Sequence, residues 1–392
     1  MVARYVEYVP ANEALDIIAL EASTSASLRT FNTILLALLL LASYLLNTTL
    51  LLTILPSRRL RGSPIYLMFC HLSVINLFDL SFSVLLSLLF VANGKWTFGE
   101  EWCRVNATVQ EFSQIYTLLT LILMSVERAV GLAIDTPPTP DAQPLPEKSR
   151  LLNSNRIVVF SIFHGFASLV IASPSATSLV PVKAFRNRYV CATGSGAPLG
   201  YILTRLALYI ACLCVLLVCI SLIFKKRGEH SLPQHFHEYS DFICKTCAMQ
   251  EHLSRAKLVT LLVSVFILVE GPYLSICFSY EICNSKELVN KLNMPDIPQD
   301  ADTLVTSLKF LFPLLSPICI LFWCSDISVY IKKLFSCRTY DPPCVNGQST
   351  NRCKGELEIF SLVALQQLHT MCKVEADFDF SDFLSKSSFF TK

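Results

Sequence analysis

Charged side chains are scarce in this sequence. Only 16% of its 392 residues are Asp, Glu, Lys or Arg, whereas 53% are hydrophobic, and ordinary soluble domains carry about 25% charged residues. The shortage is concentrated in long blocks, as is typical of segments that lipid rather than water surrounds. The formal net charge is only +2, which argues against nucleic acid as a default partner. The composition therefore indicates an integral membrane protein.

Signatures of catalysis are also missing. The sequence contains no P-loop, no H-E-x-x-H zinc motif and no nucleophile constellation, so we expect no enzyme, no metal site and no cofactor. Cys244 and Cys247 have C-x-x-C spacing, which is a weak metal signal without a second pair. No inverted internal repeat is present, which argues against a transporter. The N-terminus lacks a basic start followed by an apolar run, so we expect no cleavable signal peptide.

Seven apolar blocks are long enough to cross a bilayer, which takes about 20 predominantly apolar residues in a helix. They are residues 31–55, 65–92, 104–134, 156–180, 200–224, 255–280 and 302–324. We therefore predict an all-α membrane protein, a seven-transmembrane helix bundle. Residues 1–30 precede it, residues 325–336 are predicted to form a short amphipathic helix on the membrane surface, and residues 337–392 form a tail.

The orientation follows from the basic residues of the loops, because cytoplasmic loops are enriched in Lys and Arg. Four regions that share one side carry Arg58, Arg59, Arg61, Lys148, Arg150, Lys225, Lys226, Arg227, Lys332, Lys333 and Arg338. The loop with Lys183, Arg186 and Arg188 opposes this bias. The majority predicts an extracellular N-terminus and a cytoplasmic C-terminus at the plasma membrane.

Several residues stand at spacings that one receptor family shares. Arg128 follows Cys103 by 25 residues, and Glu127 stands directly before the arginine. Further landmarks are Asn47, Asn76, Cys191, Pro272, Ser316 and Pro317. Together these residues resemble the rhodopsin-like G-protein-coupled receptors over about residues 30–336.

This resemblance implies roles for the matching residues. It implies a Cys103–Cys191 disulfide that pins an outer loop to the third helix, with two free thiols as the alternative. It implies that Arg128 pairs with Glu127 at rest and contacts a G protein when released; the alternative is an arginine that merely snorkels to the interface. Pro272 kinks the sixth helix and permits its movement, unless the kink is only structural.

The sequence also departs from the family pattern at several positions that take part in switching the receptor between its resting and active states. Asn76 replaces an acid, Ala129 an aromatic residue, Glu270 a tryptophan, Ser316 an asparagine and Ile320 a tyrosine. We expect a core polar network of Asn47, Asn76 and Thr117, which offers dipoles but no charge. These departures favour the alternative of a receptor-fold protein with weak, constitutive or no G-protein signalling, such as a scavenger or a partner of another receptor.

The resemblance places a ligand pocket near Gln110, Glu111, Glu270 and Lys309. Gln110 stands where amine receptors carry an aspartate, which argues against a biogenic amine. Glu270 and Lys309 are ionisable groups near mid-membrane, where charge is expensive unless it is paired. We predict an ion pair between them; the alternative is a protonated Glu270 and a Lys309 that reaches water. Lys309 stands one residue away from the retinal lysine of opsins, which argues against an opsin.

Two positions are candidates for modification. Asn106 begins an Asn-Ala-Thr sequon, although it is expected in a crowded helix. Cys337 follows the amphipathic segment and is a candidate for palmitoylation, with a free thiol as the alternative. The sequence thus predicts a receptor for an extracellular non-amine ligand, such as a peptide or a lipid, that signals through a heterotrimeric G protein. Arrestin and membrane lipids are further expected partners.

Overall fold

The computed structural model describes residues 11–134, 154–177, 179–186, 188–229, 239–288, 299–324, 327–328 and 331. These residues belong to one compact unit, Met1–Ser336. Cys337, the tail, the 135–153 loop and most of the expected surface helix lie outside the described residues.

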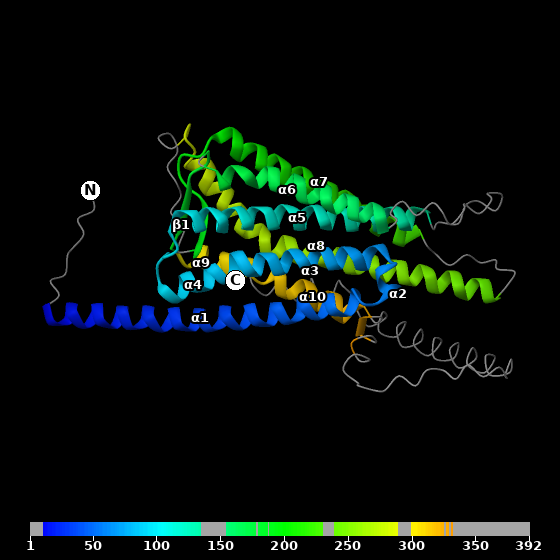
Figure 1. Cartoon of the computed structure of the whole chain (residues 1–392), viewed down its shortest axis with the longest axis horizontal. Coiled ribbons are helices and arrows are strands. Elements are labelled where there is room, and N and C mark those ends of the chain that lie inside the picture. The colour runs from blue at the N-terminus through cyan, green and yellow to red at the C-terminus, as the bar shows by residue number, and fades with distance from the viewer. Residues whose placement is uncertain are drawn as a thin grey trace. The chain divides into compact units, whose positions relative to one another are not determined.

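Thirteen elements follow one another in the described part of the chain. They are α1 (Ala11–Ile54), α2 (Arg58–Arg61), α3 (Pro64–Asp79), the π-helical turn η1 (Leu80–Val84), α4 (Leu85–Asn93), α5 (Gly99–Ile134), α6 (Ser154–Ala176), β1 (Val182–Phe185), β2 (Val190–Thr193), α7 (Leu199–Glu229), α8 (Tyr239–Cys283), α9 (Gln299–Lys309) and α10 (Phe312–Trp323). The long helices run side by side as a bundle (Figure 1).

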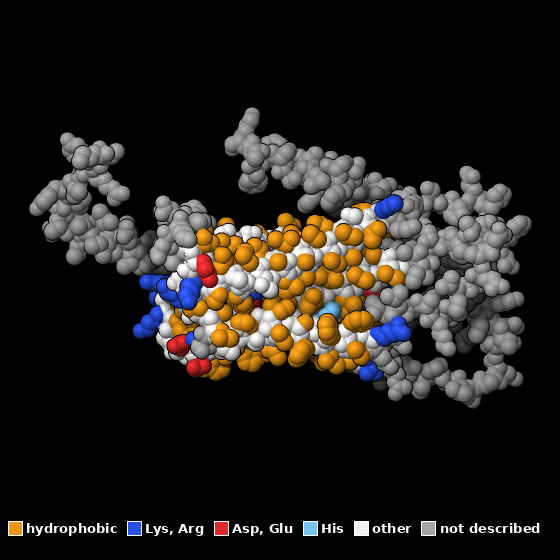
Figure 2. Space-filling view, turned by 90° about the horizontal axis from the view of Figure 1, so that it is seen from above, with side chains coloured by type: hydrophobic (Ala, Val, Ile, Leu, Met, Phe, Trp, Pro, Cys, Tyr) orange, Lys and Arg blue, Asp and Glu red, His pale blue; other side chains and the backbone are white. Residues whose placement is uncertain are grey.

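The predicted seven-helix membrane bundle is confirmed. Seven helical segments are long and apolar enough to cross a membrane: Arg29–Ile54, Pro64–Asn93, Gly99–Gly131, Arg156–Ala176, Leu199–Lys225, Leu253–Cys283 and Asp302–Trp323. Hydrophobic side chains cover the flank of the bundle shown in Figure 2, and Lys and Arg side chains gather at its two ends. This distribution is that of a protein whose sides face lipid and whose ends face water.

The helix boundaries differ from the apolar blocks where the chain continues as helix beyond the apolar stretch. The first helix begins at Ala11 and the sixth at Tyr239, well before the blocks that start at residues 31 and 255. The seventh span is divided, because α9 ends at Lys309 and α10 begins at Phe312 with Pro313 in its first turn. Proline fits a first turn because its missing N–H has no helical acceptor there.

Helix α5 forms the centre of the bundle. It contacts α3, α6, α7, α8 and both strands, and it lies between α3 and the pair α6 and α7 in Figure 1. Its span is 67% buried, whereas that of α6 is only 17% buried. Polar residues of α5 therefore face other helices rather than lipid, which explains why the third block is the most polar of the seven.

A two-stranded hairpin covers one end of the bundle, which we call the hairpin end. Strands β1 and β2 pair antiparallel, with Val182 opposite Thr193 and Phe185 opposite Val190. The predicted disulfide is confirmed, because Cys191 of β2 is bonded to Cys103 near the start of α5, with their Cα atoms 5.3 Å apart. We call the opposite end, where α5 carries Arg128, the Arg128 end.

Candidate functional site

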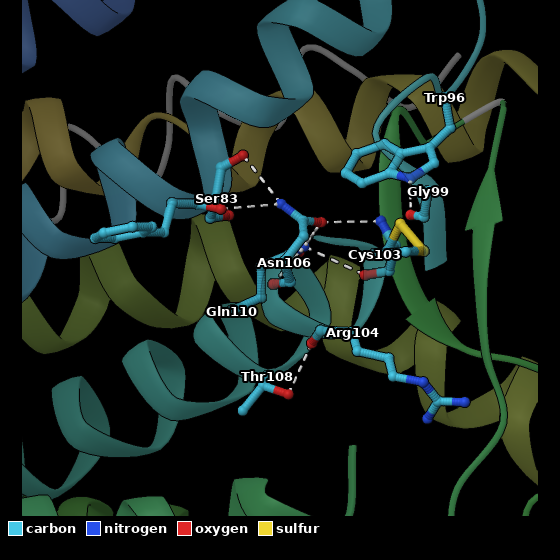
Figure 3. The surroundings of a disulfide bond; sticks show 10 residues. Ser83, Trp96, Gly99, Cys103, Arg104, Asn106, Thr108 and Gln110 are labelled. Carbon is cyan, nitrogen blue, oxygen red and sulfur yellow. Dashed lines mark hydrogen bonds between the residues drawn. A yellow bond between two sulfur atoms is a disulfide. The ribbon is translucent and has the colours of Figure 1, made fainter. Parts of the chain in front are cut away.

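Asn106 fixes the hairpin to the bundle (Figure 3). Its Oδ1 accepts hydrogen bonds from the Cys191 N–H at 3.0 Å and from Gln110 Nε2 at 2.7 Å. Its Nδ2 donates to the carbonyl oxygens of Phe82 and Ser83, at 3.3 and 3.2 Å. Both carbonyls belong to η1, where the wider π turn changes the helical hydrogen-bond pattern.

The glycosylation candidate Asn106 is engaged inside the protein in this folded arrangement. The side chain is fully buried, and both of its polar atoms are occupied within the protein. The sequon marks a structural asparagine, and the crowding expected from its position in a helix is what the structure shows.

A small cavity, the hairpin cavity, lies beneath the hairpin. It has a volume of about 30 Å³, room for one or two water molecules. Its lining includes the hairpin residues Cys191, Ala192 and Thr193 and, from the helices, Gln110, Glu111, Gln114, Arg205, Tyr273, Cys277, Phe278 and Glu281. The cavity therefore joins α5, α7, α8 and the hairpin at one place.

An arginine with two carboxylates dominates this cavity. Arg205 Nε lies 2.5 Å from Glu111 Oε1, and its Nη1 lies 3.0 Å from Glu281 Oε2. All three side chains are less than a tenth exposed. The guanidinium also lies over the rings of Tyr201 and Phe278, at 5.2 and 5.3 Å from their centroids. This cluster joins α5, α7 and α8.

Glu111 was predicted as a pocket residue, but Arg205 and Glu281 were missed. The sequence could have indicated Arg205, because an arginine inside an apolar block is a functional candidate by default. Its two partners could not have been assigned, because they come from helices whose rotation the sequence does not define. Glu111 also accepts hydrogen bonds from Ser175 Oγ at 2.8 Å and from the Tyr201 hydroxyl at 3.1 Å.

A second cavity, the central cavity, lies deeper in the bundle and has a volume of about 20 Å³. Its polar lining consists of Asn76, Asp79, Ser113, Gln114, Thr117, Glu270 and Lys309. Gln114 lines both cavities, so only a thin layer of side chains separates them.

The predicted ion pair between Glu270 and Lys309 is wrong. Lys309 Nζ instead donates to Gln110 Oε1 at 2.7 Å and lies 4.4 Å from the centroid of the Tyr273 ring. Glu270 Oε2 accepts a hydrogen bond from Gln114 Nε2 at 2.9 Å. Two amide side chains of α5 thus stand between the charges, which share the central cavity without a direct contact.

Asp79 is the residue that the sequence interpretation overlooked here. It follows Asn76 by three residues, so it lies one turn further along the same helical face. Its Oδ1 is buried and has no hydrogen-bond partner among the described residues. The expectation of dipoles without charge in this region is therefore wrong, and the 3.6-residue period alone could have corrected it.

Two residues of the expected core polar network, Asn47 and Asn76, are hydrogen-bonded to each other beside this cavity. Asn76 Nδ2 donates to Asn47 Oδ1 and to Ser316 Oγ, each at 3.0 Å. Asn47 Nδ2 in turn donates to the carbonyl oxygens of Ser43 and Pro313, each at 2.8 Å. These hydrogen bonds join α1, α3 and α10. Thr117 lies on α5 and lines the central cavity.

At the Arg128 end, the guanidinium of Arg128 forms an ion pair with its neighbour Glu127. Arg128 is only 4% exposed, so this pair is held inside the bundle. Nearby, Trp323 Nε1 donates to the carbonyl oxygen and Oγ of Ser254, at 3.0 Å each, and so joins α10 to α8. Pro272 lies inside α8 and Pro317 inside α10.

The arrangement has two cavities beneath a disulfide-bonded hairpin and a buried acid–arginine pair at the other end. The family model of the 7 transmembrane receptor (rhodopsin family) matches residues 46–320. This range contains the linings of both cavities, the disulfide and the Glu127–Arg128 pair. No curated protein is significantly similar to the chain. The chain belongs to the rhodopsin family of seven-transmembrane receptors.

Proposed function

We propose that this protein is a plasma-membrane receptor that binds an extracellular peptide, lipid or other ligand, not a biogenic amine, and activates a heterotrimeric G protein. The observation that carries the proposal is the buried Glu127–Arg128 pair at the bundle end opposite the hairpin cavity. A cavity at one end and a releasable arginine at the other are the two parts that a transmembrane signal requires.

The orientation proposed for the receptor places the hairpin end outside the cell. Disulfides form and persist in oxidising compartments, and Cys103–Cys191 lies at this end. The basic loops after the first, third and fifth spans would then face the cytoplasm, as the positive-inside rule favours.

Helix α8 is the element that would connect the two ends. It contributes Glu281 to the hairpin cavity and Glu270 to the central cavity. It also contributes Ser254 to the hydrogen bonds with Trp323. A ligand that changes the contacts of the first two residues would shift α8 relative to α5, and Pro272 provides a point at which the two halves of the helix can bend.

The test is nucleotide exchange on purified heterotrimeric G proteins, with a ligand screen that uses arrestin recruitment as an independent readout. We expect Arg128→Ala to reduce both basal and stimulated exchange relative to the wild type. The control is Arg104→Ala, which removes an arginine of the same helix at the hairpin end, where it pairs with Glu100 and donates to the carbonyl oxygen of Thr177, and which should leave exchange unchanged. Equal exchange by the Arg128 variant and the wild type would exclude this mode of coupling.

A receptor-fold protein with weak, constitutive or no coupling is the second candidate. Glu270 favours it, because this residue replaces the family's tryptophan beside Pro272 and its carboxylate is engaged by Gln114. The same experiment decides between the two. A wild-type protein that binds ligand but drives no exchange above that of empty membranes fits the second candidate alone.

A further inference from the structure

We propose that the hairpin cavity binds a positively charged group of its ligand, such as the Lys or Arg side chain or the free N-terminus of a basic peptide. The role of this group in signalling rests on the proposed receptor function, but its binding does not require a G protein. The inference comes from the charges that line the two cavities.

The hairpin cavity carries more negative than positive charge. Its charged lining residues are Glu111, Glu281 and Arg205, two carboxylates against one guanidinium. A charge inside a bundle is costly unless an opposite charge accompanies it. One negative charge of this cavity is therefore without a matching cation on the lining.

The excess charge is located on the side of Glu281. Arg205 is held in place by its contacts with both carboxylates and by the rings of Tyr201 and Phe278. Glu111 is satisfied by Arg205, Ser175 and Tyr201. Glu281 is bonded by Arg205 through Oε2 and by the Thr193 side chain, one partner fewer than Glu111 has, which leaves its carboxylate the better partner for an incoming cation.

The charges that line the central cavity, which lies beneath, add to the negative electrostatic field of the hairpin cavity. Its charged lining residues are Asp79, Glu270 and Lys309, again two carboxylates against one cation. Glu270 is 5% exposed, and among the described residues it has no partner besides Gln114. The two stacked cavities therefore hold four carboxylates and two cations, and apolar walls concentrate such a field on whatever enters.

The hairpin itself does not compensate for this charge. Arg188 follows β1 and donates through Nε to both carboxylate oxygens of Asp302, at 2.6 and 2.9 Å. Its guanidinium also lies over the rings of Phe185 and Tyr280. Its Nη1 also donates to Cys277 Sγ at 3.4 Å, and Cys277 lines the hairpin cavity. Because Arg188 is paired with Asp302, the two together leave the charge balance of the cavity unchanged.

The size of the hairpin cavity suits a small cationic head rather than a large ring system. A volume of about 30 Å³ accommodates one or two water-sized groups, and an ammonium group is within that size. Hydrogen bonds to a charged partner are roughly twice as strong as those between neutral groups. The neutral counterpart of a cationic probe should therefore bind at least about tenfold more weakly, which corresponds to about 1.4 kcal/mol.

The test uses the full-length receptor in lipid nanodiscs, without G protein and in a buffer of low ionic strength, so that the probe is the most abundant cation. Thermal stability is titrated with two matched pairs of probes at millimolar concentrations. One pair is Nα-acetyl-lysinamide and Nα-acetyl-6-hydroxynorleucinamide, in which a hydroxyl replaces the ammonium; the other is Nα-acetyl-argininamide and Nα-acetyl-citrullinamide. Each pair changes the charge with little change of shape, and the two pairs distinguish an ammonium from a guanidinium.

Glu281→Gln is the decisive variant, and Glu101→Gln is its control. The first keeps an oxygen for Arg205 and leaves the guanidinium with one full carboxylate partner, so the fold is expected to persist. The second removes an exposed acid near the start of α5, outside the cavity lining. We expect at least one cationic probe to stabilise the wild type and Glu101→Gln, its neutral counterpart to act at least tenfold more weakly, and Glu281→Gln to lose the difference.

Three results would overturn the proposal: no effect of either cationic probe, equal effects of charged and neutral probes, or an unchanged preference in Glu281→Gln. A proton held by Glu281 in place of a ligand cation would appear as the second of these results. Charge-selective binding by a receptor that fails to activate any G protein would instead refute the proposed coupling and leave this inference standing.

Discussion

The cluster of Arg205, Glu111 and Glu281 gives the sharpest test of the structure. The change is Arg205→Met, which keeps much of the side-chain volume but removes the cation that, within the described part of the chain, touches both buried carboxylates. Removal of one partner from a buried ion pair costs about 3–5 kcal/mol. As an independent figure, two like charges about 5 Å apart repel by about 3 kcal/mol at an effective dielectric constant of about 20.

The assay is thermal denaturation of the purified receptor in nanodiscs at neutral pH. At roughly 2 °C per kcal/mol for a chain of this size, Arg205→Met should lower the midpoint by about 6–10 °C. Arg205→Lys should fall between the variant and the wild type, because it keeps the charge but loses the planar fork that reaches two carboxylates.

A triple variant separates charge from packing. Arg205→Met combined with Glu111→Gln and Glu281→Gln removes all three charges and keeps oxygen acceptors for Ser175 and Tyr201. Neutral replacements of buried ion clusters are often harmless, so the midpoint should return to within a few degrees of the wild type. If the triple variant is as unstable as Arg205→Met, the cost comes from lost packing and the electrostatic reasoning is refuted.

Three further results are expected. Thr108→Ala, which destroys the sequon, should leave the electrophoretic mobility of the protein unchanged before and after deglycosylase treatment; a mobility shift would show that a glycan is attached. Asn106→Ala should lose about 2–5 kcal/mol of stability, because it removes four hydrogen bonds. The double reversal Glu270→Lys with Lys309→Glu should fail to restore thermal stability lost in either single reversal, and full rescue would demonstrate a direct pair. Trp323→Phe should raise basal nucleotide exchange, since α10 then loses its hydrogen bonds to α8, and exchange at or below the wild-type rate would contradict this role.

Features that depend on chain spacing could be predicted from the sequence. Seven apolar blocks led directly to seven spans, and the resemblance to the receptor family, which rests on residue spacing, implied the correct disulfide partner. Both depend on helix length and residue order, which composition and spacing record directly.

Features that depend on which side chains meet across helices could not be predicted in the same way. Glu270 and Lys309 do share a cavity, but Gln110 and Gln114 reach them first. A shift of a few ångströms or a modest helix rotation decides whether a charged side chain bonds to an amide or to an opposite charge. No sequence pattern encodes such a shift or rotation. Asp79 differs, because its place on the face of Asn76 follows from helical periodicity.

The hydrogen bonds of Asn106 connect the disulfide to a buried charge. From the Cys191 N–H the chain of contacts runs through Asn106 Oδ1 to Gln110 Nε2, and from Gln110 Oε1 to Lys309 Nζ. Reduction of the disulfide would free β2 and so remove one end of this relay. The loss of the disulfide would then reach an ammonium group in the middle of the bundle, so the position of Lys309 would depend on whether the hairpin is still covalently attached to α5.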